Sequence, residues 1–570
     1  MAAICGILGR RDRKTVQAMA EAMAHRGRAT HVAQGDAYTV ASSVAFGNTL
    51  CLLDGTARGP AGDALGPAEL QGACEALGLP DALEVQGGFA AAVQVGREWW
   101  LIRDRLGRKP LYYAPGDGWV LFASELKGLL ASGLVSKHLN LASVDRYLTL
   151  RCVPGPETII QGVRRVRPGH VLAFADGQVN ESAFATFDLS VHDTTRDEAA
   201  AQLRDLLGRS LERCSAEGLL WSAGIDCAAL AGLGPGRPAV FVALKSSWQE
   251  EAWRARESAR LLGVQLESRK PRRFSERMFE QVAYHLDEPV ADASVFPLWM
   301  IAEQASRDAS VLMSGHGADE LLGGYPRYHF MQRAHGAKRL VPVNFLSGLL
   351  PALPPNAVVR RGGRYLSSIR DNLEAYLSLL SVFDHHERED LYTDAMKAAI
   401  YEKGGSPSVM RPHFLDGDLT HNLLALDLNV GLPDLLLAQC DRLMAAHGAT
   451  LEFPYLDDAL VDFALSMPPK VKYGVRSKPL LRQAMRGVLP GRIRQRARRG
   501  FRVPLDGPAV RVIDKAAHDI VTQERVEASG LFKWPYVQRV LAAKAHNIYR
   551  RRQFWALLMF FAWYRTIMER

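Results

Sequence analysis

The chain has 570 residues, which is too many for one hydrophobic core and predicts roughly three to four domain-sized units. Its composition, 48% hydrophobic and 23% charged residues without a low-complexity tract, is that of an ordered globular protein and excludes a disordered or fibrous chain. The formal net charge of +9 is spread over a large surface, so we interpret it as solvated surface charge rather than as a nucleic-acid-binding site.

The cysteines and the apolar runs favour a cytoplasmic protein that does not enter a membrane. Seven cysteines are scattered singly, without the Cys-x-x-Cys or Cys/His spacing of a zinc site, which favours a reducing compartment. Residues 1–14 become charged too early for a signal peptide. The most apolar run, 554–564, is well short of the roughly 20 residues that cross a bilayer, so we predict a buried terminal helix.

The first part of the chain, to about residue 132, is predicted to be an α+β sandwich. Short apolar segments separated by turns that contain Gly and Asp predict strands, and residues 16–24 predict a helix. A helical connector from about residue 140 leads to Pro154-Gly155-Pro156 and a short strand pair that ends near residue 174. The predicted strands cover residues 85–93, 99–102, 111–113 and 120–123.

The second part begins near Thr195 and alternates helices with apolar strands. This alternation predicts a parallel sheet whose ligand-binding loops follow the C-terminal ends of the strands. From about residue 341 onward the sequence is predominantly helical in pattern. The predicted helices cover residues 198–212 and 250–262, and the predicted strands cover residues 218–221, 239–244 and 311–313.

One predicted strand runs directly into Ser222-Ala223-Gly224-Ile225-Asp226-Cys227 and an alanine-rich helix. A short glycine-containing loop at a helix N-terminus favours a bound anion, because its N–H groups and the helix dipole point toward the ligand. Ser222 adds a hydroxyl donor, and Asp226 offers an oxygen ligand for Mg²⁺. A plain turn of small residues remains the alternative explanation for this loop, because one short glycine loop is weak evidence.

A second loop, Ser314 to Tyr325, follows the predicted strand 311–313 and contains His316 between two glycines. Asp319 also lies just after a strand end, so Asp226 and Asp319 are expected to flank one metal ion at the same sheet edge. The unperturbed pKa of histidine, about 6.5, lets His316 exchange a proton near neutral pH. The two loops together predict a nucleotide site.

Both loops resemble the asparagine synthetase family. Residues 222–227 are similar to the pattern SGGxDS of pyrophosphate-releasing ATP enzymes, and residues 314–325 are similar to SGxGxDExxGGY. The resemblance implies a glutaminase-like (class II amidotransferase-like) domain over residues 1–190. It also implies a synthetase domain over residues 195–570, built on a parallel-sheet PP-loop ATP pyrophosphatase fold with a largely helical C-terminal part. Further similar segments, in family order, are residues 103–113, 122–125, 287–289, 453–457 and 477–482.

The resemblance implies activation of a carboxylate as an acyl-adenylate, followed by attack of an amine and release of AMP and pyrophosphate. Lys478 matches the lysine that neutralises charge on the phosphate and on the tetrahedral intermediate. Mg²⁺ is implied on Asp226 and Asp319. Ala223 and Cys227 replace a glycine and a serine of the family pattern, which removes one hydroxyl contact to pyrophosphate. The implied ATP-binding residues are Ser222, Ala223, Gly224, Ile225, Asp226, Cys227, Leu244 and Gly315.

The first domain departs from the family at its predicted glutaminase site. In glutamine-using members a cysteine follows the initiator methionine and becomes the N-terminal nucleophile. Here Cys5 follows Met1-Ala2-Ala3-Ile4, so removal of Met1 exposes Ala2. Because several parts of one constellation are missing together, we expect this domain to be catalytically inactive. The other departures are Arg28-Ala29 in place of Pro-Asp after His25-Arg26-Gly27, no arginine near Asn48, and no Asn-Gly-Glu-like segment in residues 54–71.

Family members that use no glutamine include the β-lactam synthetases and the lasso-peptide cyclases, which attack an acyl-adenylate with the amine of the same substrate. His316 stands where glutamine-dependent members have an acidic residue and β-lactam synthetases a tyrosine. We therefore predict His316 as the general base for the amine. The alternatives are a structural histidine or a phosphate contact. Glu374 and Glu387 are possible acidic partners of His316, and Asp287 and Glu288 are expected to shape its pocket.

The resulting hypothesis is an ATP-dependent macrolactam synthetase resembling lasso-peptide cyclases. Its substrate would be the leader-cleaved core of a precursor peptide, with an Asp or Glu side chain as acceptor and the N-terminal amine as nucleophile. A leader peptidase and a leader-binding protein are further partners that the sequence leaves open. The alternatives are a small-molecule amide or β-lactam synthetase, an asparagine synthetase that uses free ammonia, and a non-catalytic scaffold. Retention of Asp226, Asp319 and Lys478 argues against a scaffold.

Overall fold

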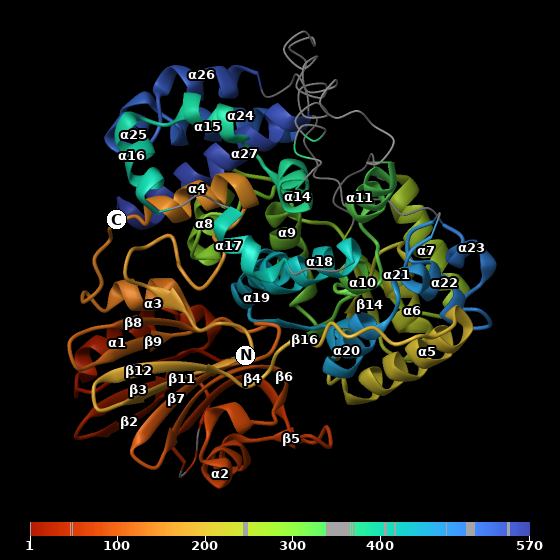
Figure 1. Ribbon diagram of the computed structural model, residues 1–570, viewed down its shortest axis with the longest axis horizontal. Coiled ribbons are helices and arrows are strands. Elements are labelled where there is room, and N and C mark those ends of the chain that lie inside the picture. The colour runs from red at the N-terminus through yellow and green to blue at the C-terminus, as the bar shows by residue number, and fades with distance from the viewer. Residues whose placement is uncertain are drawn as a thin grey trace.

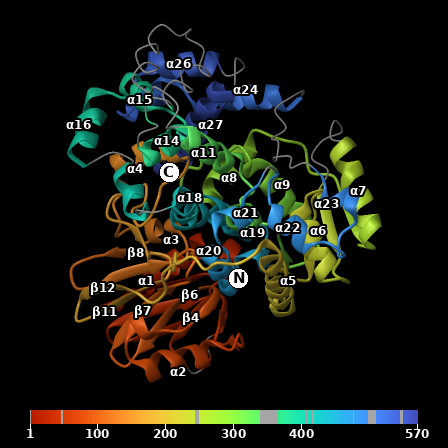
Figure 2. The same ribbon diagram turned by 45° about the vertical axis from the view of Figure 1, so that its right-hand side comes forward.

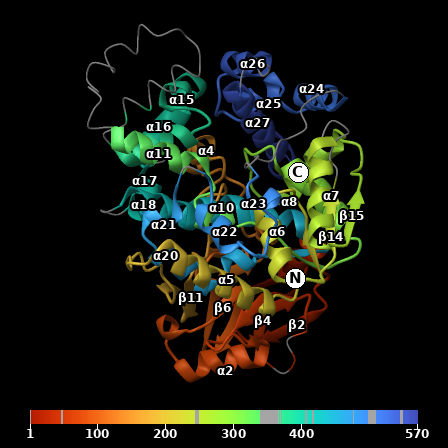
Figure 3. The ribbon, with the colours of Figure 1, turned by 90° about the vertical axis from the view of Figure 1, so that its right-hand side faces the viewer.

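A computed structural model shows two six-stranded antiparallel sheets, one five-stranded parallel sheet and many helices (Figure 1). The sheets form an N-terminal sandwich, β1 to β12, and a C-terminal region that begins at helix α5. In all three views the sandwich lies at one end of the molecule and helices α24 to α27 lie at the other (Figures 1, 2 and 3). The structure describes residues 2–45, 47, 49–242, 249–337, 365, 368, 371–403, 407–414, 418–474, 476–496, 508–543 and 548–569.

The sandwich has four layers, because each of its two sheets carries a helical layer on its outer face. Strand β1 (Ile4–Leu8) shows the underlying alternation. Its side chains Ile4 and Leu8 point between the sheets, while Cys5 and Ile7 point toward the helices. Helices α1 (Arg13–Ala22) and α3 (Leu126–Ala131) cover the first sheet, and α2 (Pro67–Leu77) covers the second. The predicted α+β sandwich is confirmed.

The order of the strands shows how the sandwich closes on itself. The first sheet runs β10-β8-β9-β1-β3-β2 and the second runs β12-β11-β7-β6-β4-β5. The strands of the first sheet are β10 (Arg164–Arg165), β8 (Tyr112–Pro115), β9 (Val120–Ala123), β1, β3 (Tyr38–Ser42) and β2 (His31–Gly35). The strands of the second are β12 (Gln178–Ala183), β11 (His170–Ala175), β7 (Glu98–Arg103), β6 (Gln86–Val95), β4 (Cys51–Arg58) and β5 (Ala64–Leu65).

The C-terminal region contains the predicted parallel sheet, in the order β15-β14-β13-β16-β17. The chain leaves β13 toward β14 and β15, and then returns to place β16 on the other side of β13. This reversal makes the C-terminal ends of β13 and β16 a topological switch point, where open α/β sheets bind their ligands. The strands are β13 (Gly218–Leu220), β14 (Ala239–Val242), β15 (Leu266–Arg269), β16 (Val311–Met313) and β17 (Thr450–Glu452).

Helices surround this sheet and form the far end of the molecule. Helix α6 contacts β13 beside α5 and α7, whereas α9 and α19 contact each other and the sheet. The predicted terminal helix is α27, whose side chains from Phe554 to Trp563 are buried. The helices named here are α5 (Arg196–Arg213), α6 (Ile225–Leu233), α7 (Gln249–Leu262), α9 (Val295–Ala305), α19 (Ala438–Ala445), α24 (Pro508–Ile520), α26 (Trp534–Ala542) and α27 (Ile548–Trp563).

One helical stretch, His421–Ala445, is long and apolar enough to span a membrane by length and composition. However, 72% of its apolar window is buried inside the protein. This stretch includes a π-helical segment, Asp427–Leu437, that continues into α19. Its burial is that of a core helix of a globular fold.

The structure adds detail to the helical pattern predicted after residue 341. The stretch from Asn372, which we expected to be one helix to Asp390, is two helices, α14 (Asn372–Leu380) and α15 (His385–Leu391), because the side chain of Asp384 caps a new N-terminus. Strand β17 lies in the part of the chain whose pattern predicts helices, and its three residues are too few to indicate a strand from sequence alone. The C-terminal part of the predicted strand 239–244, with Leu244, lies outside the described residues.

Candidate functional site: two loops at the switch point

The structure brings the two predicted loops into direct contact. Strands β13 and β16 are parallel neighbours, so the loops that follow them leave the same edge of the sheet. A Cβ atom at Gly315 would lie 3.0 Å from Cβ of Asp226 and 3.3 Å from N of Cys227. A side chain at this position would require the two loops to move apart, so a glycine favours their close approach.

The first loop has the form of an anion site. Gly224 precedes helix α6 and provides no side-chain cap, so the N-terminal N–H groups of α6 remain available to a ligand. The hydroxyl of Ser222 accepts a hydrogen bond from N of Gly224 at 3.2 Å and donates to Sγ of Cys227 at 3.2 Å. The Cys227 thiol donates to O of Leu220, and burial raises its pKa. The side chain of Cys227 therefore connects the hydroxyl of Ser222 to the carbonyl of Leu220 within the loop. Ile225 is also buried.

Lys478 lies between the two predicted carboxylates. Its Nζ is 2.6 Å from Oδ1 of Asp226 and 2.6 Å from Oδ1 of Asp319, and the residue is only 2% exposed. Burial alone would lower the pKa of Lys478, but the two carboxylates outweigh burial and raise that pKa above its usual value. The lysine is thus a fixed positive charge at the edge of both loops.

Asp226 and Asp319 can supply only part of the coordination shell of Mg²⁺. Such partial coordination by the protein is usual for this ion. Within the described residues, no group of three or more His, Cys, Asp or Glu side chains comes together as a metal cage. Mg²⁺ is commonly held by one or two carboxylates while phosphate oxygens and water complete its octahedron. The carboxylates of Asp226 and Asp319 both contact the ammonium of Lys478, so they lie close enough together to fit that role.

The turn near the end of the second loop, at Gly324, holds Asp319 in place. N of Gly324 donates to O of Asp319 at 2.8 Å, and a Cβ atom at Gly324 would overlap both Oδ1 of Asp319 and Cε of Lys478. Oε2 of Glu320 accepts from N of Gly317 at 3.0 Å, and the hydroxyl of Tyr325 donates to Glu320. These contacts fix the loop around its acidic residue.

His316 is half-buried within the electrostatic influence of the ammonium of Lys478. Its Nδ1 is 2.6 Å from Oγ of Ser314. Burial is the main reason that the pKa of His316 falls to about 4, and the negative charge of Asp319 opposes this shift. The imidazole is therefore neutral at pH 7. Among the described residues, Ser314 is the hydrogen-bonding partner of His316, and Nε2 is the nitrogen left for a substrate.

The expected acidic residues do not accompany His316. Glu374 lies near Arg411, and Glu387 forms the capping box of helix α15 with Asp384. Asp287 and Glu288 were expected to shape the same pocket, and that expectation is wrong, because both contact the N-terminal sandwich. Asp287 accepts from N of Leu126 at 2.9 Å, and Glu288 accepts from N of Ile159 at 2.9 Å.

Three further residues reach the site from the segment after β17. The hydroxyl of Tyr455 donates to O of Asp226 at 3.1 Å, and the ring of Phe453 meets His316 edge-on with 6.2 Å between ring centroids. A Cβ atom at Gly317 would lie 2.6 Å from Cδ2 of Leu456. The resemblance marked residues 453–457 without giving them a role, because nothing in the sequence pairs them with the loops.

Cys5, which the sequence predicts not to serve as an N-terminal nucleophile, lies in the interior of the sandwich. Cys5 is inside strand β1, where it pairs with Ala41 on one side and Ala123 on the other. It is fully buried, and burial raises the pKa of its thiol to about 12. A thiol held in the protonated state inside a sheet is a poor nucleophile.

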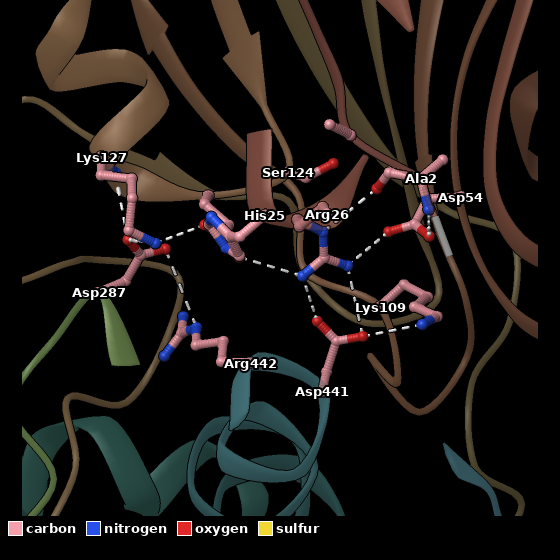
Figure 4. Close-up of polar contacts among 12 residues, drawn as sticks. Ala2, His25, Arg26, Asp54, Lys109, Ser124, Lys127, Asp287, Asp441 and Arg442 are labelled. Atoms are coloured by element: carbon pink, nitrogen blue, oxygen red, sulfur yellow. Dashed lines mark hydrogen bonds and ion pairs between the residues drawn. The ribbon is translucent and has the colours of Figure 1, made fainter. Parts of the chain in front are cut away.

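Charged side chains surround His25 and Arg26 at the predicted glutaminase site (Figure 4). The guanidinium of Arg26, 2% exposed, lies 2.8 Å from Asp54, 3.1 Å from Glu125 and 2.7 Å from Asp441. The other oxygen of the Asp54 carboxylate accepts from N of Ala2 at 2.8 Å. Because Asp441 belongs to helix α19, this buried network joins the sandwich to the C-terminal region.

Comparison with known proteins agrees with this geometry. The asparagine synthase family matches residues 202–565, and the glutamine amidotransferase domain family matches residues 70–185. Asparagine synthetase [glutamine-hydrolyzing] 1 of Bacillus subtilis is 25% identical over 497 residues, covering 82% of this chain and 75% of that protein. A Mycobacterium bovis protein assigned as a glutamine-hydrolysing asparagine synthetase is 27% identical over 543 residues, covering 85% of this chain and 77% of that protein.

A fungal relative carries a different name. Amidase chyE of Penicillium rubens is 24% identical over 523 residues, covering 81% of this chain and 76% of that protein. The synthase match spans well over half of the chain and contains both loops and Lys478. The protein therefore belongs to the asparagine synthase family, with a glutamine amidotransferase-like domain before its synthase domain.

Proposed function

We propose that this protein is an ATP-dependent amide ligase that adenylates a carboxylate and transfers the acyl group to an amine, releasing pyrophosphate and AMP. The observation that carries this proposal is the buried ammonium of Lys478 between Asp226 and Asp319, at the contact of two strand-end loops. The family membership supports the same chemistry.

The first step forms the acyl-adenylate. A substrate carboxylate oxygen attacks the α-phosphorus of ATP, and the bond from that phosphorus to the departing pyrophosphate breaks. The N–H groups at the start of α6 and the hydroxyl of Ser222 bind the phosphates, while Lys478 compensates their developing charge. Mg²⁺ held by Asp226 and Asp319 would neutralise phosphate oxygens and orient them for this displacement.

The second step forms the amide. The amine nitrogen attacks the acyl carbon, the bond from that carbon to AMP breaks, and a proton of the amine must be removed. Nε2 of His316 is proposed to take that proton, because Ser314 holds the ring through Nδ1 and the neutral form prevails at pH 7.

We further propose that the amine does not come from glutamine. Cys5 is buried inside β1 with a protonated thiol, and a network of charges occupies the region around Arg26. This supports an inactive glutaminase-like domain and an amine supplied by a substrate. Our preferred reaction is macrolactam formation in a precursor peptide, with an Asp or Glu side chain as acceptor. Amidation of a small molecule has support from the relatives named as asparagine synthetases.

Pyrophosphate exchange into ATP tests the first step. Purified protein, ATP and Mg²⁺ are incubated with peptides that bear Asp or Glu and with small carboxylates such as aspartate. We expect exchange with one class, and a loss of at least about 100-fold in Lys478→Met and Asp319→Asn, because the first removes the cation that compensates phosphate charge and the second removes a carboxylate that would hold Mg²⁺. Lys470→Met, at an exposed lysine, is the matched control. No exchange with any carboxylate would contradict the proposal.

Mass spectrometry of the products then separates the two substrate classes. A macrolactam leaves the peptide lighter by the mass of one water, whereas amidation of a small molecule leaves any peptide unchanged. Ring formation on a peptide would support the preferred reaction, and an amide found only on a small molecule would replace it.

A further inference from the structure

The N-terminal sandwich contacts one segment of the synthase domain that lies against both loops of the candidate site, residues 222–227 and 314–325. This segment comprises residues 450–458, from strand β17 through the short helix η7 (Pro454–Leu456) to the first residue of helix α20 (Asp458–Ser466). Strand β17 pairs with β16, and O of Glu452 accepts from N of Ser314 at 3.0 Å. Through Phe453, Tyr455 and Leu456 the segment contacts His316, Asp226 and Gly317.

The sandwich contacts this segment at both of its ends. At the start, Nζ of Lys109 donates to Oγ1 of Thr450 at 3.0 Å. At the far end, Nη2 of Arg108 donates to O of Leu456 at 2.7 Å, and N of Gly87 donates to Oδ2 of Asp458 at 3.1 Å. The two cations are adjacent in the sequence, so one turn of the sandwich fixes both ends.

The middle of the segment is buried, and helix α5 also holds it: Oγ of Ser210 donates to O of Pro454 at 2.8 Å, and Nη2 of Arg213 donates to Oδ2 of Asp457 at 2.7 Å. A cavity of about 190 Å³ lies at the seam, lined by Arg108 and Lys109 on one side and by Thr450, Phe453 and Asp457 on the other. The sandwich therefore acts on η7 together with α5, and its bond from Arg108 to O of Leu456 reaches η7 itself. A carbonyl held by a charged guanidinium is fixed more firmly than one held by a neutral donor.

We infer that Arg108 is a positioning residue of the synthase site, which acts through Leu456 and Tyr455 on the Asp226 and His316 loops. The sandwich thus contributes to adenylation without any glutaminase chemistry of its own. This inference rests on the proposed function for its activity readout only. Displacement of reacting groups by about 1 Å lowers rates by roughly 100-fold, so loosening of η7 is expected to reach the chemistry.

Arg108→Ala tests the inference, with Arg105→Ala as its matched control. Arg105 also links the sandwich to helix α20, through Asp462 at 2.9 Å, but it is remote from η7. We expect Arg108→Ala to lower kcat for pyrophosphate exchange by at least 10-fold at an unchanged folded fraction. We expect Arg105→Ala to stay within twofold of the parent, and Arg108→Lys to recover part of the loss, because an ammonium still donates to the carbonyl.

Deuterium uptake supplies a readout that does not depend on activity. Faster uptake at residues 222–227 and 453–458 in Arg108→Ala, but not in Arg105→Ala, would support the inference even if the parent protein showed no exchange activity. That combination would reject the proposed function alone. Equal uptake and equal kcat in the two variants would show that Arg108 only docks the sandwich, and would overturn the inference.

Discussion

At the scale of single residues, Lys478 combines an unusual backbone with an unusual charge environment. It has φ 54°, in the left-handed region, where a non-glycine residue costs about 1–2 kcal/mol. Such a conformation persists only where the surroundings determine it, and here two carboxylates bind the ammonium. His316 is the second distinctive residue, since its partner is a hydroxyl rather than the expected carboxylate.

His316→Ala separates the two chemical steps. We expect amide formation to fall by about 100-fold or more, which is the usual contribution of a general base, while pyrophosphate exchange stays within about threefold. His335→Ala, at an exposed histidine, is the control for loss of an imidazole. An equal loss of both activities would make His316 a nucleotide-site residue instead.

The amide step should show no titration of its general base in the range where a free histidine titrates. The pKa of His316 is lowered to about 4, so its neutral form prevails at every pH above that value. After correction for the titration of the attacking amine, whose ordinary pKa is about 8, single-turnover amide formation from preformed adenylate is expected to be flat between pH 5 and pH 7, within about twofold. A fall in rate centred near the ordinary histidine pKa of about 6.5 would contradict this assignment.

At the scale of secondary-structure elements, the position of the site follows from the order of the strands. The apolar runs before residues 222 and 314 were sufficient to predict β13 and β16, and parallel strands bring their C-terminal loops to one edge. The contact between those loops then depends on Gly315, and the approach of Lys478 to Asp319 depends on Gly324, where a side chain would overlap both residues.

The sequence was less informative where long-range packing decides the structure. Segment 450–458 is too short and too mixed in polarity to predict, although its Tyr455 reaches Asp226 across 229 positions. The hydrogen-bonding partner of His316 is Ser314, two positions away, and not one of the distant acids that the sequence offers as candidates. Asp287 and Glu288 were placed wrongly, because no local pattern says which of two neighbouring domains a buried carboxylate faces.

Gly324→Ala tests the close approach of the turn to the cation. The new Cβ would overlap Asp319 and Lys478, so at least one of these side chains must move. We expect pyrophosphate exchange to fall by about 100-fold with the fold retained, as judged by circular dichroism. Gly72→Ala, in helix α2 with no atom within 4 Å of the added Cβ, is the control and should stabilise the protein by about 0.5–1 kcal/mol. Full activity of Gly324→Ala would contradict the placement of Lys478.

At the scale of the whole molecule, buried charges join the sandwich to the synthase domain. Asp441 of helix α19 is central to this seam, because it binds both Arg26 and Lys109 of the sandwich (Figure 4). Burial opposes ionisation of Asp441, but the two cations outweigh burial and lower its pKa to about 2. The same seam carries Asp287, at 2.8 Å from Lys127.

Asp441→Asn is expected to destabilise the protein by about 3–5 kcal/mol at pH 7, since it leaves two buried cations without their shared anion. Asp462→Asn, at a half-exposed carboxylate, should cost only about 0–1 kcal/mol. Urea unfolding of both variants measures the difference, and similar values would contradict a structural role for the network.

The same carboxylate gives a pH dependence of stability. The pKa of Asp441 is lower in the folded than in the unfolded protein, so its contribution is present above the unfolded value of about 3.9 and is lost as pH falls toward about 2. The difference in unfolding free energy between parent and Asp441→Asn should therefore shrink over this acidic range. A difference that stays constant down to pH 2 would contradict the assignment.

We propose that this protein makes an amide by ATP-dependent chemistry without hydrolysing glutamine. The most direct measurement follows AMP, glutamate and amide product together, in parent and Cys5→Ala protein, with and without glutamine. We predict one AMP per amide, no glutamate above background, and equal rates for the two proteins, because Cys5 is buried inside β1. Amide formation that requires glutamine, yields glutamate in equal amount and disappears in Cys5→Ala would contradict the account.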